Sequence, residues 1–262
     1  MNTYKLYQVD AFAEKLFSGN PAAVCPLDSW ISDDLLQKIA MENNLAETAF
    51  YVGRDGRYEI RWFTPNTEVD LYGHATLAAA HVLFEYEDRP ETPIRFYSPR
   101  SGELKVSKTP DGLTLDFPAD EFHEVPVSTE LTDCFDKKPI EAHKGRTDYM
   151  LVFANESDIA DIEPQLESVA KLKARGIIVT AKGEKADFVS RFFAPQSGVA
   201  EDPVTGSAHT TLAPYWAAKS GKTELSAMQL SARKGYLRCK VLGERVEISG
   251  QAKLYLKGEI YI

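Results

Sequence analysis

The longest apolar stretch of the chain lies at residues 75–84, ATLAAAHVLF, where only Thr76 and His81 are polar. An element that is apolar on every side is normally buried on every side, so this pattern predicts a central helix rather than a surface helix. Gly73 and His74 stand at its start, where backbone N–H groups lack partners and the helix dipole is positive. Such a helix start can hold an anion.

Alternating apolar and polar positions predict strands on both sides of this stretch. In the first half we expect strands at residues 4–12, 49–52, 58–63, 94–97, 103–107 and 113–117, and a further strand that begins at residue 22. In the second half we expect them at 149–153, 177–180, 187–193, 225–231, 236–242, 245–248 and 253–262.

Local signals place three further helices and the connections between them. Ser32 caps a helix that runs to about Asn43, with Asn43 or Asn44 in the left-handed exit. Pro164 opens a second helix, which Gly176 closes. A third begins at Ser207 and contains Pro214, which removes a backbone hydrogen bond. The polar stretch 118–146 is interpreted as a connection that contributes an edge strand.

The order of elements restarts after this connection, and some residues repeat with it. Arg61-Trp62-Phe63 is echoed by Arg191-Phe192-Phe193 at an offset of 191 − 61 = 130. Gly73-His74-Ala75 is echoed by Gly206-Ser207-Ala208 at 206 − 73 = 133, so the second loop is three residues longer. A period this long indicates a duplicated domain, not a solenoid.

The duplication predicts two similar domains. We expect residues 1–120 in the first, with a last strand at about 253–262 joining it, and residues 121–252 in the second. Each would place a buried helix with its start toward the other, so we expect the active site between the two domains.

Composition limits the classes of function. The 262 residues carry 30 basic and 39 acidic side chains, a net charge of −9, which argues against a nucleic-acid partner. Cys25, Cys134 and Cys239 are sparse and show no CxxC spacing, as is typical of reduced cytosolic thiols. We find no signal-peptide pattern and no apolar run long enough for a membrane helix, so we expect a cytoplasmic protein that does not bind membranes.

Two candidate catalytic groups lie in the first half. Glu47 follows a predicted helix and is either a solvated loop carboxylate or a general base whose pKa is raised by partial burial. His74 is either a structural histidine or a catalytic one. At a helix start its charged form is disfavoured, so the neutral ring would share a proton with a carboxylate.

The third candidate loop is Glu201-Asp202-Pro203-Val204-Thr205-Gly206-Ser207-Ala208 in the second half. Asp202 and Ser207 are both common at helix starts, so capping is a serious alternative for each. The pairing of two glycine-headed helix starts at corresponding positions, each beside an acid, His or Ser, favours a functional role.

Other chemistries are poorly supported. GxSxG is absent around Ser207, which disfavours a serine hydrolase. Five histidines show neither HExxH nor a Cys/His pairing, so no metal site is expected. GxGxxG and Walker motifs are also absent. His81 and His209 are interpreted as core residues of their helices.

The motifs together resemble the PhzF family of phenazine biosynthesis-like proteins over essentially the whole chain. The resemblance is carried by VDAFAEKLFSGNPAAVC, NNLAETAFYV, FTPNTEVDLYGHATLAAAHVL and FFAPQSGVAEDPVTGSAH. It implies an α+β fold, the duplicated diaminopimelate epimerase-like fold, in which each half is a curled, mostly antiparallel sheet around a central helix. A homodimer is also implied.

The resemblance implies an isomerase that needs no cofactor and shifts a proton within a small anionic, carboxylate-bearing metabolite. By motif position, Glu47 is the general acid/base, supported by His74 and Asp202. Backbone amides at the two helix starts, Gly73-His74-Ala75 and Gly206-Ser207, and the Ser207 hydroxyl bind substrate.

Epimerases of this fold carry a cysteine immediately before each helix-start glycine. Here those positions hold Tyr72 and Thr205, so two-cysteine racemisation is not expected. Two alternatives to the isomerase remain: a non-catalytic protein that binds small anions, and, less favoured, a serine hydrolase through Ser207.

Overall fold

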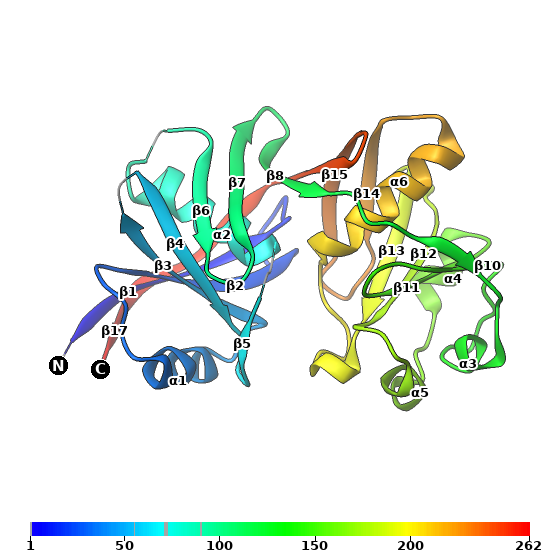
Figure 1. Cartoon of the computed structure of the whole chain (residues 1–262), viewed down its shortest axis with the longest axis horizontal. Coiled ribbons are helices and arrows are strands. Elements are labelled where there is room, and N and C mark those ends of the chain that lie inside the picture. The colour runs from blue at the N-terminus through cyan, green and yellow to red at the C-terminus, as the bar shows by residue number, and fades with distance from the viewer. Residues whose placement is uncertain (1, 55, 71–72, 90) are drawn as a thin grey trace. The chain divides into compact units, whose positions relative to one another are not determined.

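The computed structural model describes residues 2–54, 56–70, 73–89 and 91–262. Contacts between Cα atoms divide the chain into two compact units. The first comprises Met1–Asp116 and Ser249–Ile262, and the second comprises Phe117–Ile248. The chain thus leaves the first unit once and returns to it with its last strand (Figure 1).

The first unit is a curled sheet with one helix inside it and one outside (Figure 1). Its strands are β1 (Thr3–Ala11), β2 (Asn20–Leu27), β3 (Glu47–Arg54), β4 (Arg57–Phe63), β5 (Glu68–Val69), β6 (Ile94–Ser98), β7 (Gly102–Thr109), β8 (Gly112–Pro118) and β17 (Ala252–Tyr261). The inner helix α2 (Gly73–Tyr86) packs against β1, β2, β3, β7 and β17. The outer helix α1 (Asp33–Asn43) packs Leu36 and Ile39 against Phe50 and Phe63 of the sheet.

The predicted all-round burial of α2 is confirmed. Ten of its fourteen residues are buried, including every one from Gly73 to Ala80. Helix α1 shows the predicted start and exit: Ser32 accepts from the backbone N–H of Leu35, and Asn44 is left-handed, with φ of 49°. That exit turns the chain directly into β3, whose first residue is Glu47.

The second unit is again a sheet with helices on both faces. Its strands are β9 (His123–Val125), β10 (Glu141–Lys144), β11 (Tyr149–Val152), β12 (Ile177–Lys182), β13 (Phe188–Phe193), β14 (Glu224–Gln229), β15 (Gly235–Leu242) and β16 (Arg245–Gly250). Its helices are α3 (Thr129–Thr132), α4 (Glu156–Asp161), α5 (Leu166–Lys171) and α6 (His209–Ser220), with 3₁₀ turns η1 (Pro195–Ser197) and η2 (Gly206–Ala208).

Alternation along β13 fills both faces of this sheet. Val189 joins Ile159 of α4 and Val169 of α5 in one apolar cluster. The ring of Phe188, on the other face, stacks on Trp216 of α6 at 6.0 Å. A helix therefore covers each face.

Pairing in the two units follows the same plan. In the first, β2–β3 and β4–β6 are parallel, while the pairs β1–β17, β1–β2, β3–β4, β6–β7 and β7–β8 are antiparallel. In the second, β11–β12 and β13–β14 are parallel, while β9–β10, β10–β11, β12–β13 and β14–β15 are antiparallel. The predicted fold class, curled and mostly antiparallel sheets in an α+β arrangement, is confirmed.

The echoed arginines make the same contacts in the two units. Arg61 binds Glu68 through Nε and Nη2 at 2.7 and 2.9 Å, and Arg191 binds Glu201 through the same atoms at 2.7 and 3.0 Å. Each guanidinium also lies over a phenylalanine ring two residues on, at 5.1 and 5.0 Å. We call these pairs the Arg–Glu clamps. Each fixes the loop that leads to a central helix.

Two sequence expectations were wrong in detail. The helix predicted between Pro164 and Gly176 is only the six-residue α5, because Leu172 is already extended and Pro164 bridges to Phe135. Gly176 does not cap a helix: a Cβ there would lie 2.6 Å from the Phe192 ring and 2.7 Å from a backbone oxygen.

The stretch 118–146 is more than a connection with one edge strand. It contains β9 and β10, which pair with each other, and α3 between them. Tyr72, the residue before the first helix-start glycine, lies outside the described ranges.

Pro214 lies inside α6, and the helix continues through it. The carbonyl that Pro214 cannot bond, that of Thr210, accepts instead from the backbone N–H of Asp120 at 3.1 Å. The hydroxyl of Thr211 donates to the carboxylate of Asp120 at 2.8 Å. The proline thus frees a helix carbonyl that anchors the segment leading into β9.

Candidate functional site

In the first unit, the structure brings Glu47 and His74 into contact. Nε2 of His74 lies 2.7 Å from Oε2 of Glu47, close enough for an ion pair but without the alignment of a hydrogen bond. Glu47 is 1% exposed and His74 is 2% exposed. The interpretation of Glu47 as a solvated loop carboxylate is therefore wrong: it is a buried group at the start of a strand.

The other ring nitrogen of His74 faces Asn20, a residue that the sequence reasoning did not select. Nδ2 of Asn20 lies 3.2 Å from Nδ1 of His74, and Asn20 has no solvent exposure. Asn20 opens β2, Glu47 opens the parallel strand β3, and His74 stands in the first turn of α2. Two adjacent strand starts and one helix start thus supply the three side chains.

In the second unit, the carboxylate of Asp202 lies in a tightly bonded loop. The Thr205 hydroxyl donates to Oδ2 of Asp202 at 2.5 Å. Gln229, fully buried in β14, accepts from the Thr205 backbone N–H at 2.8 Å and donates to the Asp202 carbonyl at 2.8 Å. One amide therefore holds both ends of the turn that presents Asp202, which is 7% exposed.

Ser207, on the first turn of the second helix start, is bonded to Arg175. Nη1 of Arg175 donates to Oγ of Ser207 at 2.9 Å. The same guanidinium binds the carboxylate of Asp148 through Nε, at 2.9 Å, and through Nη2. Arg175 also lies 5.2 Å over the ring of Phe192. A guanidinium can only donate, so Ser207 is the acceptor in this bond and its own O–H is directed elsewhere.

These two groups of three occupy corresponding places. Ile177 opens β12 as Glu47 opens β3, at the offset of 177 − 47 = 130. Arg175 stands just before β12, and Asp148 just before β11, the strand parallel to it. We call Asn20, Glu47 and His74 the first triad, and Asp148, Arg175 and Ser207 the second triad.

The sequence reasoning found one or two members of each triad and missed Asn20, Arg175 and Asp148. None of the missed residues stands beside a helix-start glycine, which was the signal used. The duplication itself carries the missing signal, because strand starts at the 130-residue offset must lie at corresponding places.

The helix-start residues expected to bind substrate lie where backbone amides are available. Gly73 and Ala75 are buried in the first turn of α2, and Gly206 is buried in η2. The first turns of a helix present N–H groups without intrahelical partners, which suits a carboxylate. His209, one turn further on, is fully buried as expected, and its Nδ1 donates to the carbonyl of Thr205 at 2.9 Å.

The cysteines do not contribute a reactive thiolate to either triad. Burial raises the pKa of Cys25 to about 12, of Cys134 to about 11 and of Cys239 to about 12. All three are buried free thiols. Over residues 2–54, 56–70, 73–89 and 91–262, no cluster of three or more His, Cys, Asp or Glu side chains has the arrangement of a metal site. None of the helices in these ranges has the length and apolarity to cross a membrane.

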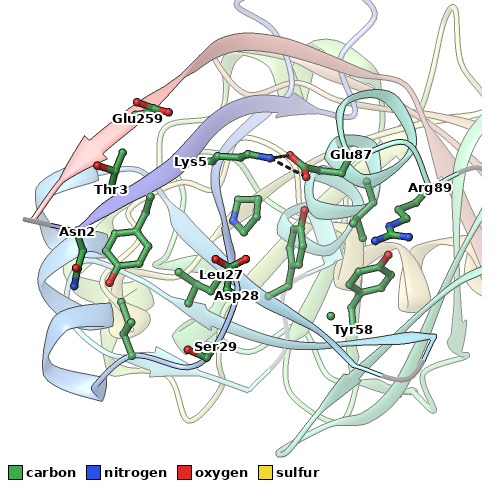
Figure 2. A pocket seen from close by; sticks show the side chains of 16 residues that line it. Asn2, Thr3, Lys5, Leu27, Asp28, Ser29, Tyr58, Glu87, Arg89 and Glu259 are labelled. Carbon is green, nitrogen blue, oxygen red and sulfur yellow. Dashed lines mark hydrogen bonds and ion pairs between the residues drawn. The ribbon is translucent and has the colours of Figure 1, made fainter.

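A cavity of about 880 Å³ opens elsewhere in the first unit (Figure 2). None of the predicted site residues lines it. Its wall carries the carboxylates of Asp28, Glu87 and Glu259 against the cations of Lys5 and Arg89, and Lys5 is already paired with Glu87 at 2.9 Å. This mixture does not favour an anionic substrate, so the cavity is not the candidate site.

The comparisons with known proteins agree with the sequence motifs. The family described as phenazine biosynthesis-like protein matches residues 9–258. An uncharacterised isomerase of Pseudomonas aeruginosa is 53% identical over 257 residues, covering 98% of both chains. An uncharacterised isomerase of Halalkalibacterium halodurans is 44% identical over 266 residues, covering 100% of both.

Comparison with solved structures points to the same family. A PhzF-family protein from Enterococcus faecalis superimposes with a TM-score of 0.97 at 46% identity, covering 100% of both chains. A hydroxyproline epimerase from Agrobacterium vitis shares the fold alone, with a TM-score of 0.62 at 8% identity over 98% of this chain and 92% of the other. With its motifs, its paired sheets and these relatives in agreement, the chain belongs to the PhzF family of phenazine biosynthesis-like proteins.

Proposed function

We propose that this protein is an isomerase that moves a proton within a small carboxylate-bearing metabolite, with Glu47 as the general acid/base and no cofactor. The observation that carries the proposal is the buried contact of Glu47 with His74 at the start of α2. The names of its relatives support the reaction class, since two of them are described as isomerases.

The chemistry follows from the first triad. Glu47 takes a proton from one carbon of the substrate, and the electron pair of that C–H bond shifts into the adjacent π system. The carboxylic acid so formed returns the proton to another atom, so the product is an isomer and the enzyme is regenerated.

The two helix starts supply binding and polarisation in this proposal. The amides of Gly73, Ala75 and Gly206 and the hydroxyl of Ser207 hold the carboxylate of the substrate. Asp202 and His74 act as supporting groups for charge that develops during the transfer. Arg175 favours an anion beside Ser207, because it is a cation bonded directly to that hydroxyl.

Deuterium incorporation tests the proposal. A panel of small carboxylic acids is first screened for compounds that raise the melting temperature of the protein. Each binder is then incubated with the enzyme in deuterated water and analysed by mass spectrometry and NMR. We expect at least one binder to gain deuterium or to be converted to an isomer.

Glu47→Gln should abolish this conversion while binding remains, because the amide cannot accept the proton. Glu42→Gln, an exposed position on α1, is the matched control and should behave as wild type. Full turnover by Glu47→Gln would refute the role of Glu47. Binding with neither deuterium gain nor conversion would favour the alternative of a non-catalytic anion-binding protein.

The contacts of Ser207 do not support the serine hydrolase alternative. Ser207 accepts a hydrogen bond from Arg175, and a guanidinium cannot act as a general base. The nearby His209 uses Nδ1 on the carbonyl of Thr205. We expect serine-reactive phosphonates to leave the protein unmodified.

A further inference from the structure

We infer that Asn20 is a positioning residue that fixes which nitrogen of His74 carries the proton. It thereby assigns the base to Glu47 and the proton donor to His74. The assignment of roles rests on the proposed function, whereas the position of the proton is a property of the folded protein and can be measured without a substrate.

The backbone holds Asn20 firmly in place. Asn20 pairs with Ala11 at the end of the β1–β2 ladder. The preceding Gly19 has φ of 69°, and a Cβ at that position would lie 2.2 Å from the carbonyl oxygen of Ala11. Only glycine fits this turn, so the direction in which Asn20 leaves it is set by main-chain packing.

Hydrogen-bond valence then decides the state of His74. Nε2 faces a carboxylate oxygen of Glu47 at 2.7 Å, and an ionised carboxylate can only accept. Nδ1 faces the amide nitrogen of Asn20 at 3.2 Å, which can only donate. Of the two neutral tautomers, the one with its proton on Nε2 turns a donor toward Glu47 and an acceptor toward the amide of Asn20.

The two other states of the ring are disfavoured. A proton on Nδ1, whether in the other tautomer or in the imidazolium, would direct two N–H donors at each other. His74 therefore cannot pass its Nε2 proton to Glu47 and take another on Nδ1 without displacing Asn20. As a result, His74 keeps its Nε2–H, and Glu47 is left as the base of the proposed reaction.

The tautomer of His74 can be read from long-range ¹H–¹⁵N correlation spectra of protein labelled with ¹⁵N-histidine. The variant His74→Gln identifies the signals of His74 among the five histidines. We expect the wild-type protein, without ligand and at neutral pH, to show His74 as the Nε2–H tautomer.

Two substitutions of Asn20 change the partner at Nδ1. Asn20→Ala removes the donor, and the signals of His74 should become an average of both tautomers. Asn20→Asp replaces the donor by a carboxylate, so His74 should take a proton on both nitrogens and its pKa should rise. Asn43→Ala is the matched control: this asparagine bonds Thr48, next to Glu47, and should leave the His74 spectrum unchanged.

A wild-type His74 protonated on Nδ1, alone or together with Nε2, would overturn the inference. An unaltered His74 tautomer in Asn20→Ala would also overturn it, and this comparison stands even if Asn20→Asp does not fold. The spectra are independent of turnover. If they are as expected while no ligand gains deuterium, the proposed function fails and the role of Asn20 in setting the tautomer remains.

Discussion

The two triads occupy the same place in two similar sheets and carry opposite chemistry. In the first, an amide and a carboxylate flank an imidazole, and all three groups are almost fully buried. In the second, a carboxylate and a hydroxyl flank a guanidinium, which stays charged at any pH that a protein survives. The first group can exchange a proton, and the second can only attract and orient an anion.

The Arg–Glu clamps show what the duplication kept. Arg61 with Glu68 and Arg191 with Glu201 retain the same atoms, nearly the same distances and the same aromatic neighbour. The three extra residues of the second loop lie between Arg191 and Glu201. The two units have therefore kept the clamp that fixes the loop before each central helix. The side chains at the helix starts, by contrast, differ.

The substitutions with the largest expected effects should change a different kinetic parameter in each triad. Glu47→Gln should lower kcat for deuterium incorporation by about 10²–10⁴-fold, because it removes the proton carrier. Arg175→Gln should instead weaken binding by about 10-fold or more, seen in KM, because it removes a charge-assisted donor. Equal losses of kcat in the two variants, with KM unchanged, would contradict the division of roles.

Breaking each Arg–Glu clamp in turn tests whether the two clamps contribute equally to the free energy of unfolding. Arg61→Gln and Arg191→Gln should each lower the free energy of unfolding by about 2 kcal/mol, since each breaks a half-buried bidentate pair. Arg61 also donates to Asp33, whose side chain is 78% exposed, whereas Arg191 also donates to the carbonyls of Ile159 and Ile162, so the loss should be larger for Arg191. Urea denaturation measures both.

Arg95→Gln is the control for the clamps. Its ion pair with Glu103 has both side chains 51% exposed, so its loss should be below about 0.5 kcal/mol. If a clamp variant were as stable as this control, the clamp would contribute little to the free energy of unfolding.

At one pair of corresponding positions, only the second helix carries a group that can make stability depend on pH. His209 corresponds to Thr76 at 209 − 133 = 76, and both are fully buried. Burial lowers the pKa of His209 from 6.5 to about 4. Between these values the unfolded chain binds a proton that the folded chain does not, so stability is complete above pH 6.5 and falls as the pH falls toward 4.

The expected loss from this histidine is about 2 kcal/mol between pH 7.5 and pH 5. His209→Thr, which copies the first helix into the second, should reduce the pH dependence of the free energy of unfolding by that amount. Chemical denaturation at the two pH values provides the measurement. An unchanged slope would assign the pH dependence to other groups.

The smallest expected effect concerns the cysteines. Because burial holds the pKa of every thiol near 11 or 12, iodoacetamide should not modify the folded protein at pH 7.5. Cys25→Ala, Cys134→Ala and Cys239→Ala should retain the wild-type rate of deuterium incorporation. Loss of that rate in a folded variant would reopen thiol chemistry.

Much of the secondary structure could be predicted from the sequence because the signals for it are local or periodic. The burial of α2 follows from ten nearly unbroken apolar residues, and the exit at Asn44 follows from a residue type that tolerates positive φ. The end of α5 could not be read this way. Leu172 is already extended, and three residues later Arg175 contacts Asp148, a residue 27 positions earlier in the chain.

His74 and Ser207 were predicted because each stands beside a helix-start glycine, whereas Asn20, Asp148 and Arg175 stand at or just before strand starts and carry no such signal. Glu47 was found through a motif, but its burial depends on the strand and helix packed around it, which composition does not report. Asn20 and Arg175 act on His74 and Ser207 across 54 and 32 residues. Such pairings exist only once the sheets have formed.

The last strand has a consequence for biosynthesis on the ribosome. Residues Ala252–Tyr261 pair along the whole of β1, the first strand to be made. The second unit, by contrast, is one continuous segment, Phe117–Ile248. The second unit is therefore the first that can close its sheet, whereas β1 keeps an unpaired edge until β17 has been made. We expect nascent chains released before residue 252 to aggregate through that edge or to be captured by chaperones.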